Sequence, residues 1–258
     1  MKLTADYHTH TPYSHGKNTV DENAAAAVAQ GLRQIAITDH GFSHVALGLH
    51  RREVPAIKRE CVEAAEKYGI EVLLGMEANV RGKKGITDIL PKDYDDFDVF
   101  LCGYHVAIYY DGLVGWGRGF WGNVLSSYLK FKPSKSLIKH NTQAYINVIK
   151  KNPIDAITHL TFLCPCEPLE VAKCAADYGT YIELNAKKLH LTDEEICDML
   201  QKTDVRFVVN SDAHTADRVG DCKLVEEQLS RLEFPLDRID NIDGRMPSFR
   251  FKALKEGR

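Results

Sequence analysis

Histidine and acidic residues recur in this sequence at the points where apolar, β-prone runs end. Six such run ends carry side chains of the kinds that bind metals in proteins. Imidazole and carboxylate groups together suit Zn²⁺, Mn²⁺ or Fe²⁺. The candidate ligands are His8, His10, His15, His40, Glu77, His105, His159, Asp212 and His214.

The spacing of these residues supports a shared site. His8 and His10 are two positions apart, as are Asp212 and His214, so each pair points to one side of an extended strand. Two ligands on one side can bind one ion or two adjacent ions. A lone histidine is more often a core or surface residue, but six run ends that all carry ligand types favour a metal site.

The number of candidate ligands indicates how many ions they serve. A catalytic zinc uses three protein ligands and keeps one position open. Nine candidates therefore match three metals, and a bridging Glu77 gives one of them a fourth bond. We expect three divalent ions, with zinc as the first choice and manganese or iron as alternatives.

Strand-like and helix-like stretches alternate along the chain, which predicts parallel strands joined by helical crossovers. Seven such units favour a TIM-like (β/α)7 barrel, with an open doubly wound sheet as the alternative. A barrel gathers the C-terminal ends of its strands at one face, where the candidate ligands would meet. The β-rich runs are Leu3–His8, Gln34–Thr38, Ile70–Glu77, Asp98–His105, Ala156–His159, Thr180–Leu184 and Val205–Ser211.

Capping residues mark the predicted helices. Thr19 with Glu22, and Thr192 with Glu195, form capping boxes. Glycines end two further helices, Arg52–Tyr68 at Gly69 and Pro168–Tyr178 at Gly179. We expect the last long helix over Ala216–Leu232.

Composition limits the class of protein. The 258 residues, with a net charge of −3, fit a single domain over 1–258. No apolar run approaches the ~18 residues of a membrane span, and the N-terminus has no apolar signal region, so we expect a cytoplasmic protein without a membrane partner. The near-neutral charge argues against nucleic acid as a partner. Seven cysteines without a Cys-x-x-Cys pair argue against a zinc ribbon.

One segment is strongly basic. From Gly112 to Ile154 there is no acidic residue and the charge is +7, which leaves −10 for the rest of the chain. We interpret residues 108–140, within which Arg118 lies, as a lid-like insertion that focuses an anionic substrate onto the metals. The alternative is an ordinary solvated loop and helix.

The motifs together resemble the PHP (polymerase and histidinol phosphatase) superfamily, and most closely its stand-alone YcdX-type phosphatases. The resemblance extends to Asn141-Thr142-Gln143-Ala144 and Glu183-Leu184-Asn185. Relatives usually continue with Pro-Gly after the strand-five histidine, whereas this chain reads His159-Leu160-Thr161-Phe162. The motifs that carry the resemblance are His8-Thr9-His10, His15, Thr38-Asp39-His40, Gly75-Met76-Glu77-Ala78-Asn79, His105, Thr158-His159 and Ser211-Asp212-Ala213-His214.

The resemblance implies a distorted seven-stranded barrel with three metals. His8, His10, Glu77 and Asp212 would hold the first metal. Glu77, His105 and His159 would hold the second, and His15, His40 and His214 the third. His140 is a rival for the place of His159, and His44, His50 and His190 are assigned to the surface or to the surroundings of the ligands.

The expected reaction is hydrolysis of a small phosphomonoester by a metal-bound hydroxide. Asp39 is a candidate to orient a ligand imidazole. Arg218 is the first candidate for binding the phosphate, followed by Arg118 and Lys187. Two other functions stay open: a metal-dependent nuclease that trims 3′ ends, and a non-catalytic, metal-binding regulatory domain.

Overall fold

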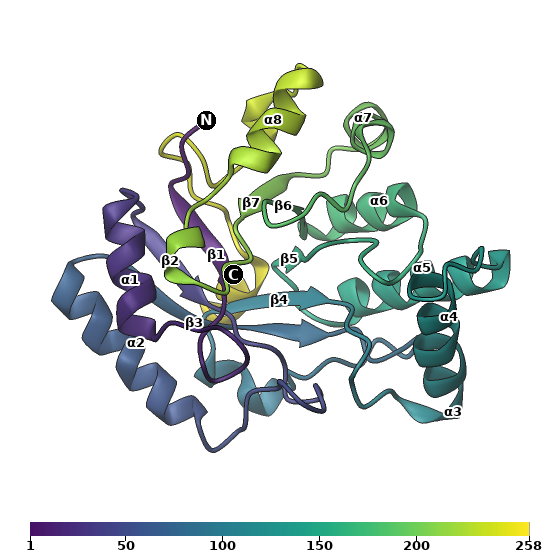
Figure 1. Cartoon of the computed structure of the whole chain (residues 1–258), viewed down its shortest axis with the longest axis horizontal. Coiled ribbons are helices and arrows are strands. Elements are labelled where there is room, and N and C mark those ends of the chain that lie inside the picture. The colour runs from purple at the N-terminus through teal and green to yellow at the C-terminus, as the bar shows by residue number, and fades with distance from the viewer. Residues whose placement is uncertain (258) are drawn as a thin grey trace.

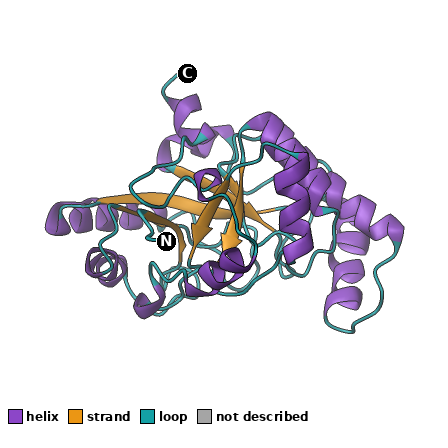
Figure 2. Ribbon diagram, turned by 90° about the horizontal axis from the view of Figure 1, so that it is seen from above, coloured by secondary structure: helices purple, strands orange, loops and turns teal. Residues whose placement is uncertain are grey.

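The computed structural model describes residues 1–257. Seven parallel strands follow one another around a barrel in chain order, with helices outside them (Figures 1 and 2). A parallel bridge between Thr9 and Ala213 joins the first strand to the segment after the last. The barrel is therefore nearly closed, which confirms the TIM-like fold and excludes the open sheet. The strands are β1 (Ala5–Thr9), β2 (Gln34–Ile37), β3 (Glu71–Asn79), β4 (Val99–Gly103), β5 (Ala156–Ile157), β6 (Tyr181–Asn185) and β7 (Phe207–Asn210).

The helices lie between the strands and pack on the outside of the barrel. Each predicted helix has a counterpart except the one over Ala216–Leu232, which is divided into two elements. Short 3₁₀ turns occur at Pro91–Asp96, Ala216–Arg218 and Leu236–Arg238. The helices are α1 (Val20–Ala29), α2 (Val54–Tyr68), α3 (Gly112–Val114), a π-helical segment (Gly115–Gly122), α4 (Asn123–Ser127), α5 (Lys135–Lys151), α6 (Pro168–Tyr178), α7 (Asp193–Lys202), α8 (Lys223–Arg231) and α9 (Arg250–Lys255).

The predicted helix boundaries are confirmed where a capping box or a terminal glycine marks the end of the helix. Both capping boxes, at Thr19 and Thr192, are formed. Gly69 and Gly179 end α2 and α6 with φ of 67° and 66°, a left-handed conformation that glycine adopts without strain. Each of these signals acts within one helical turn, which is why sequence alone finds it.

The helix expected over Ala216–Leu232 is wrong as a single element. A 3₁₀ turn at its start is followed by Gly220, which has φ of 74°, and α8 begins only at Lys223. The backbone N–H of Gly220 donates to Oδ2 of Asp6 at 2.9 Å. Because Asp6 lies in β1, a partner far away in the sequence breaks this helix.

The inside of the barrel is filled by two kinds of side chains. A small apolar cluster from six of the strands, including Tyr7 and Leu101, also receives Phe249 from the C-terminal segment. Buried polar residues occupy the end at which the strands finish. A register shift in β1 between Asp6 and Thr9 lies where that strand places His8 in the barrel, and such bulges commonly re-aim side chains beside functional sites.

Candidate metal centre

Glu77, at the end of β3, is the centre of the polar cluster. Its side chain is fully buried, and its two oxygens meet ring nitrogens from four other parts of the barrel. One carboxylate is therefore placed to contact more than one cation. The distances to Glu77 are 2.6 Å from His159, 2.8 Å from His40, 3.3 Å from His105, 3.4 Å from His8 and 3.8 Å from His10.

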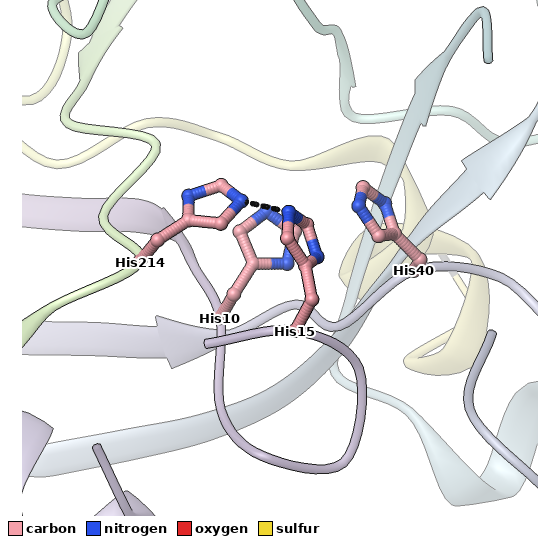
Figure 3. A group of neighbouring side chains, drawn as sticks. All are labelled: His10, His15, His40 and His214. Atoms are coloured by element: carbon pink, nitrogen blue, oxygen red, sulfur yellow. Dashed lines mark hydrogen bonds between the residues drawn. The ribbon is translucent and has the colours of Figure 1, made fainter. Parts of the chain in front are cut away.

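A second group of four imidazoles lies beside Glu77. Ring nitrogens of His10, His15, His40 and His214 all lie within 4.8 Å of one another (Figure 3). The Nε2 atoms of His15 and His214 are only 2.5 Å apart. The resemblance assigned His15, His40 and His214 to one ion, and the structure adds His10 to that group.

The remaining expected ligands belong to three further groups of three residues each, which share members with one another and with the first group. All nine candidates belong to at least one group, and all four groups lie at the C-terminal ends of the strands. His140, the rival residue, is buried in α5 and belongs to none of these groups. The three groups are His8, Glu77 and His159; His8, His10 and Asp212; and His40, Glu77 and His105.

Unpartnered polar atoms show that this donor set fits metal ions. Burial of a polar atom without a hydrogen bond is unfavourable. His40 Nδ1 and Glu77 Oε2 are 2.8 Å apart, yet neither makes an aligned hydrogen bond. Divalent cations between these nitrogen and oxygen donors would satisfy them. Six unpartnered atoms belong to candidate ligands: His8 Nε2, His10 Nε2, His15 Nδ1, His40 Nδ1, Glu77 Oε2 and His159 Nδ1.

The protonation states also suit metal binding. Burial lowers the pKa of His10 to about 3 and that of His15 to about 4, which leaves neutral rings with a free lone pair. Burial favours a raised pKa for Glu77 and Asp212, but neighbouring histidine charges outweigh it and hold both pKa values well below the usual range. The carboxylates are therefore ionised at neutral pH, as metal ligands must be.

His8 differs from the other rings because it lies between two carboxylates. Burial lowers its pKa, but the charges of Glu183 and Glu77 outweigh burial and raise the pKa well above its ordinary value. The position thus favours positive charge, and a divalent cation held by His8 would supply that charge in place of a proton.

Residues behind the ligands hold the rings in place. Glu183 Oε1 lies 2.7 Å from His8 Nδ1, and Asn79 Oδ1 lies 2.7 Å from His105 Nδ1. Thr158 Oγ1 donates to Glu77 Oε1 at 2.9 Å. Each of these three residues lies in a motif at a strand end, but the sequence alone assigns none of them a role. Such partners fix the orientation of metal-binding imidazoles.

Asp39 acts on the neighbouring loop rather than directly on an imidazole. It accepts hydrogen bonds from the backbone N–H of Thr11 at 2.8 Å and from the hydroxyls of Thr11 and Ser14. Its nearest oxygen is 4.0 Å from His10 Nδ1, whereas Ser14 Oγ is 3.5 Å from that nitrogen. Asp39 therefore holds the loop that carries His15.

Two candidate ligands have strained backbones. His159 has φ of 29° and Asp212 has φ of 49°, in a region that non-glycine residues rarely adopt. Such strain persists where surrounding contacts enforce it, and it is concentrated at functional sites. At His159 it also ends β5 after two residues, short of the predicted Ala156–His159.

A pocket of 680 Å³ opens onto the cluster. Of the three cations considered for phosphate, Lys187 lines it, with Nζ 3.3 Å from Asp212 Oδ1 and 3.0 Å from His214 Nδ1. Arg218 pairs with Asp221 at 2.6 Å, and Arg118 lines a separate groove. Other lining residues include Lys188, His44, His190 and Phe162.

Proteins of known family are similar to this chain over most of its length. The family described as PHP domain matches residues 6–187. A probable phosphatase of Caldanaerobacter subterraneus is 30% identical over 229 residues, which cover 85% of this chain and 80% of the relative. A probable phosphatase of Photobacterium profundum is 28% identical, with 93% and 89% covered.

Among solved structures, the fold is similar to that of histidinol phosphate phosphatase from Lactococcus lactis, complexed with zinc, L-histidinol and phosphate. The TM-score is 0.62 at 14% identity, and 98% of each chain is covered. The family match extends over more than half of the sequence and includes seven of the nine candidate ligands and Asp39. The chain therefore belongs to the PHP domain family.

Proposed function

We propose that this PHP-family phosphatase hydrolyses small phosphomonoesters at a site that binds three divalent metal ions. Zinc is the first choice, and manganese or iron are the alternatives. The observation that carries the proposal is the convergence of Glu77 with eight other ligand-type side chains. Six buried donor atoms of these nine residues lack hydrogen-bond partners. Relatives named as probable phosphatases support the reaction class.

Metal ions bound at such sites lower the pKa of a coordinated water and neutralise phosphoryl oxygens. The chain's own residues position the substrate. Lys187 offers its ammonium group at the pocket beside Asp212 and His214, where it can donate to a phosphoryl oxygen. Glu183 and Asn79 hold the rings of His8 and His105 in place.

The dimensions of the pocket favour a small substrate. Its 680 Å³ volume lies within the roughly 300–1,000 Å³ typical of small-molecule sites. Val106, Phe162 and Leu163 add apolar surface to the lining of this pocket. The alcohol part of a substrate whose phosphate is bound at the metals would have this apolar surface within the same pocket.

The test combines elemental analysis with a hydrolysis panel. The purified protein is loaded with zinc, manganese or iron and assayed on p-nitrophenyl phosphate, sugar phosphates, bis(p-nitrophenyl) phosphate and a single-stranded oligonucleotide. We expect about three ions per chain and a clear preference for monoesters. A preference for the diester or oligonucleotide would identify a nuclease instead. Full metal content without hydrolysis would favour a non-catalytic domain.

A further inference from the structure

Residues 112–127 form a continuous helical stretch made of α3, the π-helical segment and α4. This stretch buries small and polar residues and exposes large apolar ones. Its buried positions are Gly115, Gly119 and Asn123, spaced four apart. A Cβ atom on Gly119 would lie 2.9 Å from the ring of Tyr110. Small and polar residues thus face the protein, whereas a surface helix normally buries its large apolar residues.

The outward side of this stretch carries those apolar residues instead. Five exposed large apolar side chains lie on this stretch, and four more lie in the segments that flank it. We call the nine together the outer apolar face: Leu113, Val114, Trp116, Trp121 and Leu125 on the stretch, and Tyr109, Tyr128, Leu129 and Phe131 beside it. Leu113 is 91% exposed and Val114 is 63% exposed. Both tryptophans of the chain, Trp116 and Trp121, belong to this face. Large exposed apolar patches mark interaction sites.

The charge around the outer apolar face is positive. The sequence has no acidic residue between Gly112 and Ile154, and Arg118, Lys130 and Lys132 are exposed. A groove of 410 Å³ beside the face is lined by Arg118 and Lys132, with no acidic side chain among its lining residues. The partner must therefore combine an apolar layer with negative charge.

A second copy of the chain fits this requirement poorly. In a two-fold dimer the same patch meets itself, so the basic residues around one outer apolar face would confront those around the other. An anionic lipid surface supplies both the apolar layer and the negative charge that the outer apolar face requires of its partner. Tryptophan and tyrosine favour the headgroup region, and each nearby Lys or Arg adds attraction to acidic lipids.

We propose that residues 109–132 dock this protein on an anionic lipid surface, in contrast to the absence of a membrane partner expected from the sequence. Among residues 1–257 no helix has the length and apolar composition to cross a bilayer, but docking in the headgroup layer requires no such helix. In Figure 1, α3 and α4 lie at the right-hand edge of the molecule, near α5. Tyr128 belongs to the outer apolar face and also lines the metal pocket, so docking would hold that pocket beside the lipid.

The two tryptophans provide a built-in probe. We would mix the full-length protein with vesicles of phosphatidylglycerol or of phosphatidylcholine, then record tryptophan emission and co-sedimentation. Phosphatidylglycerol should shift the emission to shorter wavelength and sediment the protein, and about 0.5 M salt should weaken both effects. Equal binding to phosphatidylcholine, or no binding to either vesicle, would overturn the proposal.

A matched pair of variants tests the location. Val114→Glu adds a charge to the outer apolar face, whereas Val62→Glu adds one to an exposed valine of α2. We expect V114E to reduce binding to phosphatidylglycerol vesicles about tenfold or more, and V62E to bind like the wild type, with equal melting temperatures. Equal binding by V114E and the wild type would refute the assignment. If the wild type instead dimerises as its concentration rises and V114E does not, the partner of the outer apolar face is a second copy of the chain and the lipid proposal is wrong.

Discussion

The Nδ1 atom of His8 lies 2.7 Å from Oε1 of Glu183, and both side chains are fully buried. The opposite ring nitrogen, Nε2, therefore points at Glu77, 3.4 Å away. Glu183 also accepts the backbone N–H of His159 at 2.8 Å. One carboxylate outside the ligand groups thus positions two candidate ligands from different strands.

Glu183→Gln should weaken metal binding by about 10- to 100-fold, because a neutral amide holds the His8 ring less firmly and lowers its basicity. Metal dissociation constants from competition with a chelator measure the effect. Glu170→Gln, which removes a carboxylate paired with Lys173 on the surface, is the matched control and should bind metal normally. Unchanged affinity in E183Q would refute the positioning role.

Glu77→Ala should reduce activity more than alanine at any single histidine of the cluster. Its carboxylate contacts five imidazoles, so its loss weakens more than one metal position together. Turnover and metal content per chain are measured for E77A, H15A and H214A. The bridging assignment fails if E77A retains both wild-type turnover and full metal content.

Lys187→Ala should lower kcat/KM by about 10- to 150-fold, the equivalent of 1.5–3 kcal/mol for a charged hydrogen bond, without loss of metal. Arg218→Ala and Arg118→Ala should have smaller effects, since one side chain pairs with Asp221 and the other lines a different groove. Steady-state kinetics on the best phosphomonoester, with elemental analysis, compares the three. A larger loss of kcat/KM in R218A than in K187A would show that Arg218, and not Lys187, binds the phosphate.

Asp155 should make stability depend on pH. It accepts hydrogen bonds from the backbone of Phe100 and Phe251, and burial raises its pKa from 3.8 to about 7. Between these values the unfolded chain releases the proton and the folded chain keeps it. Stability therefore falls as pH rises through this window, by at most about 1.4 kcal/mol per pH unit, and the loss is complete above the folded pKa.

Urea unfolding of the wild type and Asp155→Asn, from about pH 4.5 to 8, isolates this contribution. The ligand histidines titrate alike in both proteins, so their effect cancels in the difference. The wild type should lose stability relative to D155N as pH rises toward 7. A difference that does not change with pH would show that Asp155 titrates normally.

The sequence by itself determined the barrel and the chemical character of its open end. Capping boxes, terminal glycines such as Gly69 and Gly179, and alternating strand and helix patterns are local signals that act within a few residues. Parallel strands must place their C-terminal ends together. Ligand-type residues at those ends, from His8 to His214, were therefore expected to meet, and in the structure they do.

Tertiary structure alone decided the features whose partners lie far apart in the chain. Asp6 breaks the helix at Gly220, and Glu183 orients His8. Arg218 forms an ion pair with Asp221, whereas Lys187 lines the pocket. The exposure of large apolar side chains over residues 112–127 likewise arises because Gly115 and Gly119 pack closely on Tyr110. A local pattern reports on what a residue does within a turn or a strand, whereas these contacts arise only when separate elements fold against one another.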